Sequence, residues 1–218
     1  MRHGLEMTGK KRTTGRANSN GEMGLRDALV VEGRKVFEEE GAKEISLRAL
    51  ARRLGVSETA PFKHFSGKDE LLAAIASSGF RELRDKRKRI MAREKDALAR
   101  SRAMMHSYIQ YAMSHEGLFN LMIGPRLAEF RNGEFGTAGL ESFNMFSNAI
   151  QSLAVEHGWP KESLELLAHT AWGLEHGIAA LLLAGVVPHK ESSLNVDELV
   201  RFAIELLLRA IEAGPPEA

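Results

Sequence analysis

The segment from Ser46 to Ser57 constrains the fold of this chain more than any other part of the sequence. Its residues, SLRALARRLGVS, start with a type that caps helices and continue with leucines at helical spacing. Ala51 is small enough for two helices to cross closely, and Gly55 suits the left-handed backbone of a tight turn. The segment therefore predicts a helix-turn-helix, with a shared core supplied by Leu50, Leu54 and Val56.

The rest of the chain also has helical periodicity. Apolar residues recur every three or four positions, and only 6 of the 218 residues are proline. We therefore predict an all-α protein, with an N-terminal three-helix helix-turn-helix domain followed by a C-terminal helical domain. Ser46, Ser57 and Ser66 are the expected N-caps of helices two to four. About nine helices are expected, at residues 25–40, 47–54, 57–65, 68–89, 97–115, 117–130, 139–158, 161–186 and 195–212.

The charge is distributed unevenly along the chain. Residues 1–100 contain 23 Lys and Arg against 15 Asp and Glu, and the remainder contains 7 against 14. A basic N-terminal half favours a polyanionic partner at that end, although surface charge alone gives the same pattern. We divide the chain into a disordered basic tail (1–23), a helix-turn-helix domain (24–72) and a ligand-sensing and dimerisation domain (73–218). The Pro-rich end, Gly214 to Ala218, is also expected to be disordered.

Several classes of protein lack support in this sequence. Without cysteine there is no disulfide, thiolate metal site or cysteine nucleophile, which fits a reducing compartment, so we expect the cytoplasm. The longest near-apolar run, Ile178 to Val187, is short of the roughly 20 residues of a membrane span, and the first 23 residues lack the apolar stretch of a secretory signal. Motifs of serine hydrolases, phosphate-binding loops, zinc proteases and calcium loops are missing, so we expect neither an enzyme nor a cofactor or metal.

The residues that follow the helix-turn-helix segment reveal a family resemblance. Ser46 to Ser57 is followed by ETAPFKHF, by Ser66-Gly-Lys68 and by Leu71-Leu72. Residues 24–75 resemble the DNA-binding domain of the tetracycline-repressor (TetR) family. The resemblance implies a homodimeric transcriptional regulator whose third helix enters the major groove of a double-stranded DNA operator. It also implies a repressor that a small molecule releases from a palindromic operator.

The resemblance assigns roles to individual residues of this chain. Thr59, Ala60 and Lys63 match the part of the recognition helix that faces bases, and His64 and Lys68 match phosphate-contacting positions. The backbone amides that follow Ser46 and Ser57 offer further phosphate donors, and Lys10 to Arg16 offer a minor-groove or non-specific contact. The predicted DNA-binding set is Ser46, Arg48, Ser57, Glu58, Thr59, Ala60, Phe62, Lys63, His64 and Lys68.

Two residues depart from the family pattern, and alternatives remain open. Phe62 stands where the family commonly has tyrosine, so a phenolic hydroxyl is missing, and Pro61 replaces the usual aliphatic residue. A helix-turn-helix also occurs in proteins that never bind DNA, and His64 fits an inter-helix histidine as well as a phosphate contact. The competing function is a helical protein-interaction module whose basic end binds polyanions without sequence preference. The basic run Arg84 to Arg89 is interpreted as a solvated helix face.

The C-terminal half resembles the family's small-molecule-binding domain. Two short segments, Tyr111 to Gly124 and Ala171 to Gly177, resemble a subgroup named for a Trp-His-Gly pattern. Aromatic and methionine side chains there suit a cavity for an apolar or amphipathic effector, although ordinary core packing explains most of them equally well. His169 and His176 are seven residues apart, roughly 10 Å along a helix, which is too far to chelate one metal ion. The predicted ligand-binding set is Met105, Tyr108, Met122, Phe143, Phe146, Trp172 and His176.

The last two predicted helices are strongly apolar and match the family's dimerisation helices. Apolar residues around Leu206 to Leu208 cover more than one helical stripe, which favours a partner over packing within one chain. We therefore expect a homodimer through a four-helix interface. The residues concerned are Leu181, Leu182, Leu183, Val186, Leu199, Phe202, Ala203, Leu206, Leu207 and Ile211.

Overall fold

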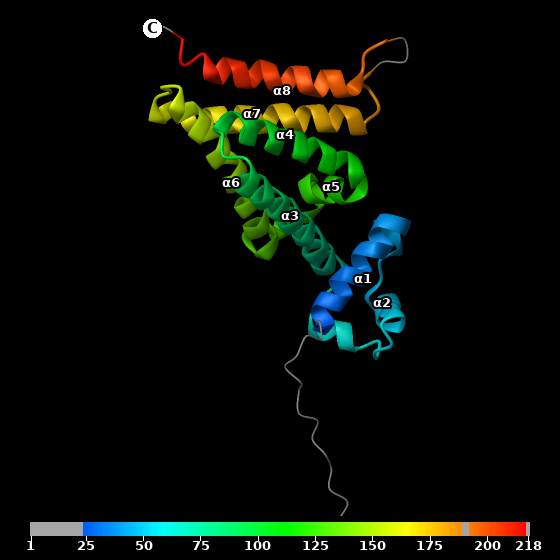
Figure 1. The fold of residues 1–218 in the computed structure, drawn as a ribbon. Coiled ribbons are helices and arrows are strands. Elements are labelled where there is room, and N and C mark those ends of the chain that lie inside the picture. Colours follow the sequence, from blue (N-terminus) through cyan, green and yellow to red (C-terminus); the bar gives the residue numbers. More distant parts are fainter. Residues whose placement is uncertain (1–23, 189–191, 217–218) are drawn as a thin grey trace, which may run out of the picture.

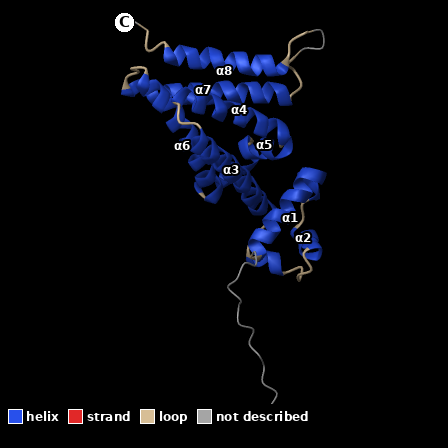
Figure 2. Ribbon diagram, in the orientation of Figure 1, coloured by secondary structure: helices blue, strands red, loops and turns tan. Residues whose placement is uncertain are grey.

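The computed structural model describes residues 24–188 and 192–216. Within these ranges every regular element is helical and no strand occurs (Figure 2), so the predicted all-α class is confirmed. The predicted basic tail at 1–23 and the last two residues lie outside the described part. The α-helices are α1 (Leu25–Glu40), α2 (Leu47–Arg53), α3 (Lys68–Arg93), α4 (Ala97–Ser114), α5 (Glu116–Ile123), α6 (Glu134–Glu156), α7 (Lys161–Leu183) and α8 (Val196–Glu212). The 3-10 helices are η1 (Ala42–Glu44), η2 (Ala60–Lys63) and η3 (Pro125–Asn132).

The helices form two unequal groups that α3 connects (Figure 1). α1 and α2 lie with η2 at one end, and α7 and α8 lie side by side at the opposite end. α3 runs from the small group into the large one, where it packs along α6 and also contacts α4 and α5. α3 is therefore shared by the two groups.

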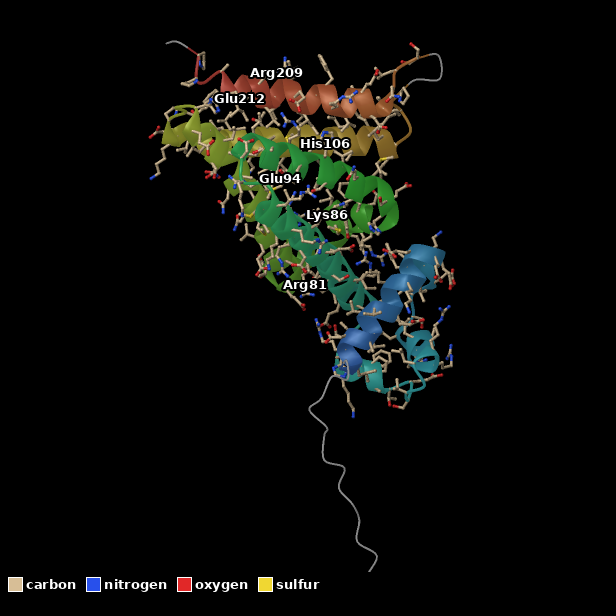
Figure 3. The ribbon with its side chains drawn as sticks, viewed as in Figure 1. Arg81, Lys86, Glu94, His106, Arg209 and Glu212 are labelled. Atoms are coloured by element: carbon tan, nitrogen blue, oxygen red, sulfur yellow. The ribbon has the colours of Figure 1, made fainter. Side chains whose placement is uncertain are left out.

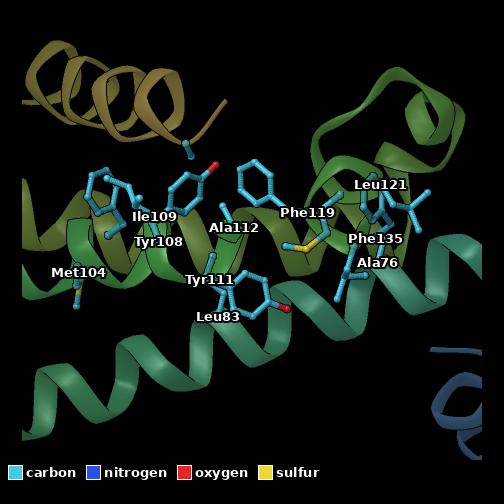
Figure 4. Packing of buried hydrophobic residues seen from close by; sticks show 14 of the residues in the cluster. Ala76, Leu83, Met104, Tyr108, Ile109, Tyr111, Ala112, Phe119, Leu121 and Phe135 are labelled. Atoms are coloured by element: carbon cyan, nitrogen blue, oxygen red, sulfur yellow. The ribbon is translucent and has the colours of Figure 1, made fainter. Parts of the chain in front are cut away.

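Buried apolar residues form one continuous core from α1 to α8. In the small group, Gly33 lets α1 approach α3 so closely that an added Cβ would lie 3.1 Å from Cδ1 of Ile75. In the large group, side chains from four different helices converge (Figure 4), among them Leu83, Tyr108, Phe119 and Phe135. The domain boundary expected near residue 72 falls inside the single helix α3 and remains a prediction.

The predicted third helix is much shorter than expected. The structure has the four-residue 3-10 helix η2 instead of a helix over 57–65, and its N-cap is Thr59 rather than Ser57. Pro61 has no N–H to donate to an α-helical ladder, which is one physical reason for the short element. The cap expected at Ser66 is also displaced, because Gly67 is the N-cap of α3. Ser66 instead donates both its N–H and its hydroxyl to the Glu70 carboxylate, at 2.6 and 2.7 Å.

The helix boundaries between residues 117 and 139 also differ from expectation. α5 ends at Ile123 before Pro125, and α6 begins at Glu134, five residues before the predicted start. The predicted helices left residues 131–138 outside any helix and began the next one at 139, but the glycines there mark close packing. A Cβ on Gly136 would overlap the backbone carbonyl of Arg131, and a Cβ on Gly139 would lie 3.4 Å from the Phe80 ring.

One described helix, α7, has the length and composition of a candidate membrane span. This is weak evidence, because a core helix of a folded domain passes the same test. α7 packs against α4, α6 and α8, and it carries the buried carboxyl group of Glu175. That the protein has no membrane segment remains a prediction.

Candidate DNA interface and ligand cavity

The helix-turn-helix forms through the contacts that its sequence predicts. The Ser46 hydroxyl accepts a hydrogen bond from the N–H of Ala49 at 3.5 Å and caps α2. After α2 the backbone turns at Gly55, whose φ of +67° is the left-handed conformation that glycine adopts without strain. The N–H of Val56 then donates to the carbonyl of Ala51 at 3.0 Å, which closes the turn.

Most of the predicted DNA-binding residues lie on one exposed stretch of the small group. The start of α2 and the segment around η2 present polar and basic side chains to solvent, and Phe62 is 48% exposed, unusual for a large apolar side chain. Pro61 and Phe65 are buried between them and anchor η2 to the core. The exposed members are Ser46, Arg48, Ser57, Glu58, Thr59, Phe62, Lys63 and His64, whereas Ala60 and Lys68 are partly buried.

Some of these side chains already have intramolecular partners. Glu58 pairs with Arg52 at 2.7 Å, so this acid neutralises part of the basic surface. Lys68 donates from Nζ to the carbonyl of Lys43 at 3.0 Å and keeps two further N–H donors. Thr59 and Ser57 share a hydrogen bond between their hydroxyls at 3.3 Å.

A cavity of about 450 Å³ lies between α3, α4, α6 and α7. Its volume falls in the range of small-molecule pockets, and aromatic rings make up much of its wall. Three predicted ligand-binding residues, Tyr108, Phe143 and Trp172, are in the lining. The other lining residues are Phe80, Leu83, Arg87, Ile123, Arg131, Phe135, Gly136, Gly139, Leu140, Ser142 and His169.

The remaining predicted ligand-binding residues lie elsewhere. Met105, Met122 and Phe146 are buried in the core outside this lining, which agrees with the alternative of ordinary core packing. His176 lines a separate cavity of about 340 Å³, and its Nδ1 is 3.1 Å from the hydroxyl of Tyr108. Burial lowers the pKa of His176 and favours its neutral form.

The structure overturns the interpretation of Arg84 to Arg89 as a solvated face. Lys88 and Arg89 are exposed, but Arg87 is 2% exposed and lines the cavity. The signal was in the spacing, because Arg87 follows Leu83 by four residues and precedes Ile90 by three, on the buried stripe of α3. The distance from Arg87 Nη2 to Glu175 Oε1 is 3.5 Å, and Glu175 is fully buried. Burial raises the pKa of the Glu175 carboxyl well above its usual range, against the effect of Arg87.

Ion pairs connect the cavity wall to the helix-turn-helix group. Glu134, the first residue of α6, pairs with Arg26 of α1 and with Arg81 of α3, which Figure 3 places low on α3. Arg126 of η3 also pairs with Asp69 near the start of α3, at 2.9 Å. The start of α6, which supplies Phe135, Gly136 and Gly139 to the cavity, is therefore linked to α1 by an ion pair.

The outer surface of α7 and α8 has exposed apolar side chains. Phe202 is 68% exposed and Leu206 is 61% exposed, and Leu181 on α7 is exposed as well. Leu182 and Ile211, which the sequence analysis assigned to the same interface, are buried within the chain. In the described residues no group of three potential metal ligands comes together.

Two family models match this chain. Residues 29–75 match the model described as bacterial regulatory proteins of the tetR family, and residues 101–207 match the tetracyclin repressor-like C-terminal domain. Together the two matches include the helix-turn-helix and most of the cavity lining, but the lining residues Phe80, Leu83 and Arg87 of α3 lie between the two matched ranges. The subgroup with a Trp-His-Gly pattern is not confirmed by them and remains a prediction.

Individual relatives and solved structures agree with this assignment. The chain is 28% identical over 156 residues to the nucleoid occlusion factor SlmA of Vibrio cholerae, covering 72% of this chain and 74% of SlmA. A match to SlmA of Vibrio campbellii is 33% identical over 88 residues, 40% of this chain, and spans only 45% of that protein. A protein of unknown function from Rhodococcus sp. RHA1 has a TM-score of 0.73 at 29% identity, over 88% of this chain and 97% of that one. The TetR regulator SCO7222 of Streptomyces coelicolor has a TM-score of 0.65 at 18% identity, over 86% and 97%, and shares the fold.

Proposed function

Because the chain belongs to the TetR family and is a DNA-binding transcriptional regulator, we propose that it is a homodimeric repressor that a small molecule releases from a palindromic operator. Members of this family bind DNA, dimerise and have no enzymatic activity. One observation carries the proposal: a helix-turn-helix with an exposed polar and basic surface is joined through α3 and Glu134 to a cavity of ligand size. We propose that it acts in the cytoplasm.

In the proposed complex, the segment around η2 enters the major groove. Lys63 donates to the O6 or N7 of guanine, and Thr59 contacts a base edge or a thymine methyl group. The exposed ring of Phe62 packs on a thymine methyl or on sugar carbons, which replaces the polar contact that a tyrosine hydroxyl would make. His64, Lys68 and the amides at the start of α2 hold phosphates.

The dimer that presents two such segments forms through α7 and α8. α7 and α8, which carry the exposed Leu181, Phe202 and Leu206, lie at the end of the molecule opposite the helix-turn-helix (Figure 1), so pairing there leaves both DNA-facing surfaces free. Glycines along α7, at Gly173 and Gly177, have open space beside them and allow another helix to approach. A four-helix interface buries these residues.

Ligand response in this proposal follows from the connection between cavity and helix-turn-helix. A molecule between α3 and α6 shifts the start of α6, where Glu134 pairs with Arg26 of α1. This changes the separation of the two η2 segments in the dimer. Operator half-sites lie about one helical turn apart. A change of a few ångströms in the separation of the two η2 segments therefore prevents both segments from docking at the same time. The ligand has this effect only if it binds the DNA-free arrangement more tightly.

The test is binding of the purified protein to the DNA around its own gene, against a scrambled duplex, at two salt concentrations. A sequence-specific regulator retains its preference for the native fragment at higher salt, whereas phosphate contacts weaken for both duplexes. The competing function, a protein-interaction module with a polyanion-binding end, gives equal binding to both duplexes that disappears with salt. Genome-wide selection of bound fragments distinguishes that outcome from an operator located elsewhere.

A further inference from the structure

The charge of the cavity lining differs from that of an ordinary apolar pocket. Two arginines, Arg87 and Arg131, line it together with His169, and the described lining contains no aspartate or glutamate. Glu175 is not part of the lining; it is fully buried, and its Oε1 lies 3.5 Å from Nη2 of Arg87. A molecule in the cavity therefore meets two guanidinium groups and no carboxylate in the wall itself.

The Arg87 guanidinium has incomplete hydrogen bonding. Its Nη1 donates to the carbonyl and to the hydroxyl of Ser142, at 2.7 and 2.9 Å. Its Nε–H has no hydrogen-bond partner among the described residues, and neither oxygen of Glu175 has one. Burying a polar N–H without a partner costs about 1–3 kcal/mol, so the Arg87 guanidinium is buried at a cost in free energy.

We propose that the cavity binds an organic monocarboxylate with an aromatic or otherwise apolar body, whose carboxylate pairs with the Arg87 guanidinium. The inference rests on the proposed role of the cavity as the effector site and names the chemical class of its ligand. Arginine presents parallel N–H donors that match the two oxygens of a carboxylate. The body of the ligand lies among Phe80, Phe135, Phe143 and Trp172, where only an apolar group is compatible with the rings.

Other ligand classes fit these contacts less well. A cation meets Arg87 and Arg131 without a compensating acid in the lining, which costs electrostatic free energy in a site of low dielectric. A neutral apolar molecule fills the volume but brings no negative charge to Arg87 and Arg131. A single carboxylate supplies the negative charge that the lining lacks.

The experiment uses the full chain and calorimetry with a panel of aryl-substituted carboxylates, such as 4-phenylbutanoate and 6-phenylhexanoate, and the primary amide of each. We expect at least one carboxylate to bind, about 10- to 100-fold more tightly than its amide, which is the effect of a hydrogen bond to a charged group. The Arg87→Met/Glu175→Gln double variant removes both buried charges and is expected to lose this preference for the carboxylate. Lys88→Met, a change to the neighbouring exposed residue of α3, is the matched control and keeps it.

The possible outcomes separate this proposal from the function on which it rests. The monocarboxylate assignment is overturned if no carboxylate binds, if the amides bind equally well, or if a folded double variant keeps the preference. Amides that bind and release DNA leave the effector role of the cavity intact. Carboxylates that bind through Arg87 without any change in DNA affinity support the assignment and contradict the proposed ligand response.

Discussion

The helix-turn-helix and the cavity both present charged side chains, but they hold them in opposite ways. Near η2 the charged groups are exposed and locally paired, as Glu58 is with Arg52. Hydrogen bonds from the N–H and hydroxyl of Ser66 lower the pKa of Glu70. At the cavity, burial raises the pKa of Glu175, and its pairing with Arg87 is long and incomplete. Exposed charges can therefore be replaced at little cost to stability, whereas the buried pair couples stability to ligand binding.

The largest expected effect of a single substitution is at the buried pair. Arg87→Met removes the hydrogen bonds to Ser142 and the charged neighbour that favours ionised Glu175, and we expect the free energy of unfolding to fall by about 3–5 kcal/mol. The Arg87→Met/Glu175→Gln double variant recovers much of this loss because no ionisable group is left in the buried site. Denaturation in urea, with circular dichroism as the signal, measures both. Equal stability of wild type and Arg87→Met contradicts the contrast between the two regions.

The next effect is on DNA binding and leaves stability unchanged. Lys63→Ala removes a proposed contact to guanine, and we expect a loss of about 1–3 kcal/mol in operator binding. Because Lys63 is exposed and makes no core contact, the free energy of unfolding changes by less than about 0.5 kcal/mol. Fluorescence anisotropy with labelled operator measures the affinity, and Lys35→Ala on an exposed part of α1 is the control. A large loss of stability in Lys63→Ala would show that Lys63 supports the fold, and would contradict its assignment as a DNA contact only.

A turn residue of the helix-turn-helix is expected to matter for stability. Gly55 has a φ of +67°, where a side chain costs about 1–2 kcal/mol, so Gly55→Ala destabilises the fold by that amount. Gly55→Asn costs less, because asparagine tolerates this conformation better than alanine. Thermal unfolding of the two variants gives the comparison. Identical melting temperatures for both variants and the wild type contradict the assigned turn.

The pH dependence of stability distinguishes the two regions as well. The folded-state pKa of Glu175 is raised, so the folded protein holds a proton that the unfolded chain has already released above about pH 4.3. The raised pKa of Glu175 therefore adds to the free energy of unfolding. This contribution is complete below that pH and is lost as the pH rises towards the folded-state pKa. In that window, wild type loses up to about 1.4 kcal/mol per pH unit relative to Glu175→Gln. Urea titrations of both proteins between pH 4.5 and 8 measure the difference, and parallel curves contradict a raised pKa.

The sequence predicted the helix-turn-helix better than the cavity, for a physical reason. Capping by Ser46, the turn at Gly55 and the exposure of Lys63 depend on neighbours within a few residues, so local patterns identify them. The short η2 was missed because the expected cap at Ser57 predicted a helix over 57–65, whereas Pro61 has no N–H to donate to an α-helical ladder. The cavity depends on four helices that are distant along the chain.

Two features of the cavity were misread from local patterns. Gly136 was predicted to precede the helix that begins at Gly139, although both glycines lie inside α6, where Arg131 and Phe80 pack closely. Arg87 was assigned to a solvated run because five other charged residues surround it in sequence. Its place on the stripe of Leu83 and Ile90 was a usable signal, but Glu175, its partner, is 88 residues away. The two come together because α3 and α7 both pack against α4 and α6.

The central claim is that occupation of the cavity changes the affinity of the helix-turn-helix for DNA. Its most direct test is the dissociation constant of the operator complex, measured with and without a saturating carboxylate that calorimetry has shown to bind. We predict that the ligand weakens operator binding at least fivefold, within the usual range of allosteric coupling, and that operator DNA weakens ligand binding by the same factor. An unchanged operator dissociation constant with the cavity occupied would contradict the account.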